Sequence, residues 1–240
     1  MVLKSGNSNL FRSSLTIACL ELQKSIYSPV FAIYSAGFLI MLSTSIFITG
    51  GFLDSNLLSL RAQWNSLPFI SVLFVCLFAM RMFDSKTNSS ELNLILSKPL
   101  SNTGVVLGKW LCGLFVLTLL LMLTFPFLIT QKILGDPDWG IAFSGYLGAV
   151  LFLGSMYAHS LFAAAICREQ VSSFILGVFF VGGLVLFDLG FEIAATFLDL
   201  LVPIEIFVYH ASPKYWMNEF ASGKLDIAAI WYFLITTAGS

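Results

Sequence analysis

Long runs of apolar residues, separated by short polar stretches, dominate the chain. A helix needs about 20 residues to cross a hydrocarbon core about 30 Å thick, and most of the runs reach that length. We predict six spans, at Val30–Phe52, Leu67–Phe83, Val105–Ile129, Ile141–Ile166, Val171–Phe191 and from Ile227 to the end of the chain. The last run is too short for a straight crossing, so it either continues beyond the sequence or sits shallowly.

The composition agrees with lipid as the solvent of this chain. Of the 240 residues 58% are hydrophobic and 10% are charged, against about 25% charged residues in an ordinary soluble domain. The net charge of −1 gives no general attraction to nucleic acid. We therefore predict an all-α, polytopic membrane protein with one transmembrane domain over residues 1–240. The first apolar run is as long as a full span, which does not suit a cleaved signal.

The distribution of cationic residues predicts the orientation. With a cytosolic N-terminus, eight lysines and arginines lie on the inside and four on the outside, as the positive-inside rule expects. The inner set is Lys4, Arg12, Lys24, Arg81, Lys86, Lys98, Lys109 and Arg168, and the outer set is Arg61, Lys132, Lys214 and Lys224. Five aromatic residues fall at the predicted interfaces, where amphipathic rings are stable: Trp64, Trp110, Trp139, Tyr215 and Trp216.

Two segments outside the spans have a helical pattern. Residues 1–29 include an amphipathic stretch that ends at Pro29, and it predicts a helix that lies in the inner interface or packs on the bundle. Residues 192–225 are acidic, contain two prolines and hold apolar clusters too short to cross. They predict one or two outer, re-entrant helices, which would cap an outer exit or simply connect two spans.

The largest polar interruption on the predicted cytosolic side covers residues 84–104. Ser89 or Ser90 can cap a short helix there, and Pro99 ends it. Leu92, Ile95 and Leu96 would share one face of that helix. An apolar face exposed to the cytosol needs a cover, which is a groove on a partner or else the membrane and the bundle itself.

Motifs for catalysis and for cofactor binding are missing from the sequence. It holds no Gly-x-x-x-x-Gly-Lys-Ser/Thr loop for ATP phosphates, and no His, Cys and Glu pattern with metal-ligand spacing. The four cysteines are scattered, and two lie within apolar runs, which favours a packing role. His159 lies within the fourth span, where a neutral, hydrogen-bonded imidazole is the simpler interpretation and a proton relay the functional one. Pro126 predicts a kink in the third span.

The order of several short motifs resembles the ABC type-2 permeases, and especially the gliding-motility-associated permease branch. The motifs are Leu20-Glu-Leu-Gln-Lys-Ser-Ile-Tyr-Ser-Pro29, Met80-Arg-Met-Phe83, Glu91-Leu-Asn-Leu-Ile-Leu-Ser-Lys-Pro-Leu-Ser101, Val106-Leu-Gly-Lys109, Gly135-Asp-Pro-Asp-Trp-Gly140 and Gly145-Tyr-Leu-Gly148. The resemblance, which includes the order of the elements, covers nearly the whole chain. Residues 84–90 depart from the family pattern, because they carry fewer charges and lack its glycine.

The resemblance implies a permease subunit of an exporter in the bacterial inner membrane. Such a chain is not itself an enzyme: a separate ATPase subunit binds ATP and magnesium, and a second permease, identical or different, completes the transporter. The segment 84–104 would be the coupling helix and residues 1–29 the connecting helix. The residues expected to contact the ATPase are Glu91, Leu92, Leu96 and Pro99, with Arg168 and Glu169 of the turn between spans four and five as further candidates.

Two other classes of function stay open from the sequence. A secondary transporter or channel would use charged groups or broken helices near the midplane of the membrane. A membrane scaffold of a motility or secretion machine would need neither. A neighbouring reading frame that encodes an ATPase with a Walker motif would favour the exporter.

Overall fold

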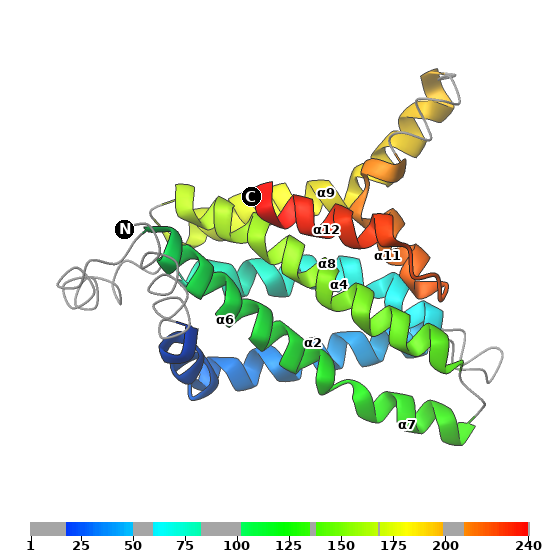
Figure 1. Ribbon diagram of the computed structural model, residues 1–240, viewed down its shortest axis with the longest axis horizontal. Helices are drawn as coiled ribbons and strands as arrows, with labels where there is room; N and C mark the ends of the chain where they lie inside the picture. Colours follow the sequence, from blue (N-terminus) through cyan, green and yellow to red (C-terminus); the bar gives the residue numbers. More distant parts are fainter. Residues whose placement is uncertain are drawn as a thin grey trace, which may run out of the picture.

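The computed structural model describes residues 18–49, 60–82, 102–134, 138–167, 169–198 and 209–239 (Figure 1). Within these ranges the secondary structure is helical, without strands. The main helices are α2 (Pro29–Thr49), α4 (Leu60–Met82), α6 (Asn102–Met122), α7 (Phe125–Leu134), α8 (Trp139–Ile166), α9 (Gln170–Leu198), α11 (Pro213–Ala221) and α12 (Ile227–Gly239).

Four helical stretches of the described chain are long and apolar enough to cross a membrane: Gln63–Met82, Thr103–Thr130, Trp139–Ile166 and Gln170–Phe187. A fifth crossing is possible if the bent pair Ala18–Ile26 and Pro29–Ser45 counts as one span. The chain is therefore a multi-pass helical membrane protein. The predicted sixth span corresponds to α12, whose 13 residues are fewer than a straight crossing needs.

The helix that precedes the first span ends where the sequence predicts. Ala18–Ile26 is helical and meets α2 at an angle of 77°. Pro29 is the first residue of α2, a position where the missing N–H of proline costs no helical hydrogen bond. The remainder of the predicted amphipathic stretch lies outside the described residues, and its position relative to the membrane stays a prediction.

The third predicted span is interrupted, as Pro126 predicts. Helix α6 ends at Met122 and α7 begins at Phe125, so the break precedes the proline. The proline ring has no N–H to donate, and it crowds the carbonyl group four residues earlier, which is that of Met122. Two hydrogen bonds at the break span three residues instead of four, from Thr124 N–H to the Leu121 carbonyl and from Phe127 N–H to the Thr124 carbonyl.

The second span begins earlier than predicted. The apolar run suggests a start at Leu67, but α4 begins at Leu60 and contains Pro68. Polar residues in the first turns conceal this start in the sequence. Gln63 is nevertheless buried, together with Trp64, because α8 and α11 pack against α4.

Helix α8 lies at the centre of the bundle and contacts α4, α6, α9, α11 and α12. Small residues let its neighbours approach closely, which is the usual basis of helix packing in membranes. Gly145 faces the ring of Trp64, and Gly148 faces the ring of Phe220. Trp64 is therefore fully buried between helices and does not face the lipid, and its predicted depth at a membrane interface stays a prediction. The glycine on α8 provides the space that its indole fills.

The last two helices form a hairpin against α8. Phe220 of α11 and Phe233 of α12 are both fully buried, and the two rings stack 6.5 Å apart. Gly223, with φ of +84°, makes the turn between the helices beside Ile141. Helix α11 lies within the predicted outer segment 192–225, whereas residues 192–198 of that segment continue α9. In Figure 1 the end of α9 projects beyond the other helices.

Candidate functional site

The residues predicted to contact an ATPase lie mostly beyond the part of the chain that the structure describes. This holds for Glu91, Leu92, Leu96, Pro99 and Arg168. Glu169 is described and is exposed, just before α9 begins. Its carbonyl group accepts a hydrogen bond of 3.0 Å from Ser173 N–H and so completes the first turn of that helix.

The two helices that flank the polar segment are joined directly to each other. The chain leaves α4 at Met82 and re-enters the described structure at Asn102, the first residue of α6. Lys109, two turns into α6, donates a hydrogen bond from its ammonium group to the Met82 carbonyl. Lys109 is 6% exposed, so this cation is enclosed by protein. A cation is also stabilised at a helix C-terminus, where the last carbonyl groups give a negative potential.

Helix α8 packs against this junction of α4 and α6. The hydroxyl group of Tyr157 donates a hydrogen bond of 3.4 Å to the Lys109 carbonyl, and its ring is fully buried against Phe78 of α4. Gly113 of α6 leaves the space for that ring, since a Cβ atom there would lie 2.0 Å from Tyr157 Cε1. A second contact joins the same two helices, from Trp110 Nε1 to the Gly154 carbonyl at 3.1 Å.

The first span joins the same region. Arg81 donates a hydrogen bond of 3.2 Å to Ser28 Oγ, and its guanidinium group lies 5.8 Å from the centre of the Tyr34 ring. We call Ser28, Arg81, Met82, Lys109 and Tyr157 the stem cluster. It connects the bend before α2, the end of α4, the start of α6 and the middle of α8. Displacement of either stem of the polar segment would therefore act on several spans.

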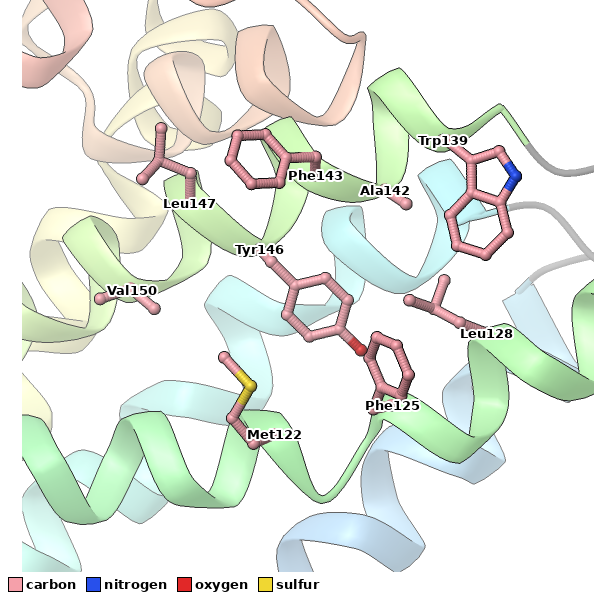
Figure 2. Close-up of a pocket in the computed structure, with 9 residues that line it drawn as sticks. All are labelled: Met122, Phe125, Leu128, Trp139, Ala142, Phe143, Tyr146, Leu147 and Val150. Carbon is pink, nitrogen blue, oxygen red and sulfur yellow. The ribbon is translucent and has the colours of Figure 1, made fainter.

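The opposite end of the bundle holds a hollow of about 340 Å³ between the broken span and α8 (Figure 2). Its walls are apolar and include Met122, Phe125, Leu128, Ala142, Phe143 and Tyr146. The hollow lies beside the break between α6 and α7, with Met122 before the break and Phe125 after it among its lining residues (Figure 2). The volume falls at the lower end of the range for ligand pockets, about 300–1,000 Å³.

The polar groups at the hollow are bonded to each other. The Thr124 hydroxyl lies 2.8 Å from the Tyr146 hydroxyl and donates to the Leu121 carbonyl at 2.6 Å. The Leu121 carbonyl thus accepts hydrogen bonds from both the N–H and the hydroxyl group of Thr124 at the break. The ring of Tyr146 packs edge-on against Trp64, with ring centres 4.8 Å apart.

Charged groups lie at the rim of the hollow. The ammonium group of Lys132 lies 5.6 Å from the centre of the Trp139 ring, which also lines the hollow. Asp138 caps α8, and its side chain accepts a hydrogen bond of 2.8 Å from Gly140 N–H. All three side chains are exposed. The predicted turn at residues 135–140 is described only from Asp138 onward.

The histidine and the cysteines of the spans have structural partners. His159 Nδ1 lies 2.8 Å from the Ser155 carbonyl, one turn earlier on the same helix, and the ring packs near Phe180. This partner of the ring lies on the same helix as His159. Cys76 and Cys112 are buried, which confirms the packing role expected of them.

The sequence indicated some of these contacts and missed others. Arg81 and Lys109 occur in the quoted motifs, but only the structure shows that they join neighbouring helices. Gly113 carries no recognisable signal in the sequence. The pair Gly145 and Gly148 was visible as a motif, yet nothing identified the two aromatic rings that it accommodates.

Fold and contacts define the class as a multi-pass, all-helical membrane protein. A scan against protein-family models and a search of curated proteins each found no match. The family assignment therefore rests on the motifs of the sequence and is a proposal.

Proposed function

We propose that this chain is the membrane-spanning permease subunit of an ATP-binding-cassette exporter, powered by ATP that a separate subunit hydrolyses. The order of motifs along the chain supports the assignment, and so does the missing P-loop, since a permease of this kind relies on a partner for ATP. The structural observation that carries the proposal is the bond from Lys109 to the Met82 carbonyl, which joins the two stems of the polar segment.

The stem cluster offers a route from the polar segment into the bundle. A force on residues 83–101 would reach α4 and α6 together, because the bond from Lys109 holds the two helices at that end. Tyr157, packed against Gly113, would pass the displacement to α8. Rigid-body motion of packed helices is a common form of such transitions. In this proposal Glu91, Leu92, Leu96 and Pro99 meet the ATPase, and Arg168 and Glu169 lie close to it.

The orientation of the chain in the membrane and its partner subunits follow from the same proposal. The stem cluster would face the cytosol of a bacterium, with the N-terminus on the same side. The hollow and the hairpin of α11 and α12 would face outward, with α11 as a re-entrant helix. A second permease, identical or different, would complete the transporter in the inner membrane, and α12 would be part of a sixth span.

Co-purification tests the proposal. The chain would be isolated in detergent from cells that express its native partners, including any ATPase encoded by a neighbouring reading frame, and the partners would be identified by mass spectrometry. We expect the ATPase to be retained by the natural chain and lost from the double variant Leu92→Asp, Leu96→Asp. A matched control is Leu225→Asp, an exposed leucine in the turn between α11 and α12 at the opposite end of the bundle. Retention by the double variant would remove the coupling assignment.

The break between α6 and α7 favours a second candidate, a secondary transporter, because discontinuous helices form substrate sites in such proteins, although this break lies toward one end of its span. Here the hydroxyl groups at the break, those of Thr124 and Tyr146, bond to each other. Transport that continues in vesicles without ATP, and without any ATPase subunit, would favour this candidate over the exporter.

A further inference from the structure

The hollow beside the broken span opens to the surface of the bundle. Met122, Phe125, Phe143 and Trp139 line it, and each is about half exposed or more. In a membrane protein this surface is covered by lipid, and an empty space would forfeit the dispersion contacts of its walls. An acyl chain is the molecule that bilayers supply to fill it.

The hydroxyl group that lines the hollow already has a hydrogen-bond partner within the protein, so it does not require a polar ligand. The hydroxyl group of Tyr146, which lines the hollow, lies 2.8 Å from the buried hydroxyl group of Thr124 and is hydrogen-bonded to it. An apolar chain could therefore occupy the space without leaving a polar group unpaired, which would be costly in a low-dielectric surrounding.

An apolar hollow alone would not select one lipid from a bilayer, since all acyl chains offer similar contacts. Selection requires the headgroup, and among the described residues next to Trp139 there are one cation, Lys132, and one anion, Asp138. Lys132 lies over the indole ring of Trp139, and Asp138 is the residue before that tryptophan. The ammonium group has three donors, and the carboxylate can accept further bonds beside the one from Gly140.

From this arrangement we infer that the hollow is a binding site for a zwitterionic phospholipid with a free amine, of the phosphatidylethanolamine type. One acyl chain lies between α7 and α8, the phosphate group pairs with Lys132, and the amine of the headgroup pairs with Asp138. The site belongs to the leaflet at the end of the bundle where α7 ends and α8 begins. It is independent of the exporter proposal, because it requires only that the bundle spans a membrane.

Native mass spectrometry of the full chain in detergent can measure this binding. The probes are phosphatidylethanolamine, phosphatidylglycerol and a diacylglycerol of the same chain length, each titrated from mixed micelles. We expect phosphatidylethanolamine to bind most tightly, because it alone satisfies both charges of the rim. Tightest binding of phosphatidylglycerol or of the diacylglycerol would overturn the inference.

Two charge variants separate the contributions of the rim. Lys132→Gln should weaken both phospholipids about fivefold and leave the diacylglycerol unchanged, since one cation is worth about that much near a lipid headgroup. Asp138→Asn keeps an acceptor for the helix cap but removes the charge, so it should abolish the preference for phosphatidylethanolamine over phosphatidylglycerol. The matched control is Lys214→Gln, because Lys214 lies over another ring, that of Phe69 at 5.2 Å. An equal loss of phospholipid affinity in this control would refute the assignment of the site to Lys132.

A third variant fills the hollow. Ala142→Leu projects three more carbon atoms into it and should weaken all three lipids alike. If that variant does not elute as a folded protein, Leu147→Trp fills the same space from a more exposed position on α8. Unchanged binding in a folded filling variant would show that the lipids attach elsewhere.

Discussion

Gly113 of α6 leaves room for the ring of Tyr157 of α8, and the variant Gly113→Ala tests this contact. The added Cβ atom would lie 2.0 Å from Cε1 and 2.1 Å from Cζ of the tyrosine ring. Ordinary van der Waals contact begins near 3.4 Å, so the ring would have to retreat by about 1.4 Å. It has little room to do so, because it is fully buried and packs against Phe78.

Two opposing effects set the size of the change. Replacing glycine by alanine within a helix gains about 0.5–1 kcal/mol of conformational free energy. Overpacking of a close-packed interior costs about 1–3 kcal/mol. Because the ring of Tyr157 is fully enclosed, we expect the overpacking cost to exceed the conformational gain. The variant should then lose about 1–2 kcal/mol of stability. For a chain of this size that lowers the melting temperature by roughly 2–8 °C.

The assay is thermal unfolding in detergent, followed by the fraction of protein that still elutes as one species after heating. Gly183→Ala is the matched control and should be neutral or stabilising, since a Cβ atom added to Gly183 of α9 would meet no other atom within 4 Å. Opposite signs for the two alanine variants are the expected result. A further change, Tyr157→Leu, should recover part of the loss in the Gly113→Ala background. If Gly113→Ala were as stable as the control, the close approach of α6 and α8 would be refuted.

Three further variants test other contacts of the bundle. Lys109→Met leaves the Met82 carbonyl without its buried donor, so we expect a loss of about 1–2 kcal/mol, read as a lower melting temperature; an unchanged value would mean that the bond contributes nothing. Tyr146→Phe removes one partner of Thr124 and should raise amide hydrogen exchange at the break between α6 and α7, while exchange elsewhere stays the same. Gly148→Ala would place a Cβ atom 2.5 Å from a buried phenylalanine ring of α11; limited proteolysis should then cut the turn after α11 faster, and equal rates would contradict that packing.

The sequence could predict the features that depend on local composition. The apolar runs identified the long spans, because a lipid-soluble helix must be apolar along its whole length. The proline residues at 29 and 126 predicted a helix boundary and a break, since the ring removes a donor regardless of what surrounds it. The burial of Cys76 and Cys112 followed from their position within apolar runs.

Contacts between distant parts of the chain could not be predicted from local sequence patterns. The sequence pattern assigned Trp64 to an interface, because a tryptophan near the end of a span is usually found there. Its burial depends on Gly145, 81 residues later, and on the approach of α11. Likewise Lys109 counted only as a positive charge, whereas its acceptor is a backbone carbonyl group that no sequence pattern marks. The predicted coupling residues mostly precede α6, outside the described structure.

The bond from Lys109 to Met82 has a consequence for how the polar segment can vary. Loop length normally matters to a fold because the loop itself must bring its two ends together, at an entropic cost that grows slowly with length. Here the ends are held by the helices themselves, through a side chain that lies outside the loop. Insertions and substitutions between residues 83 and 101 should therefore leave the bundle intact. The amino-acid sequence of this segment can therefore change to fit a different partner surface, while the helices of the membrane domain keep their packing.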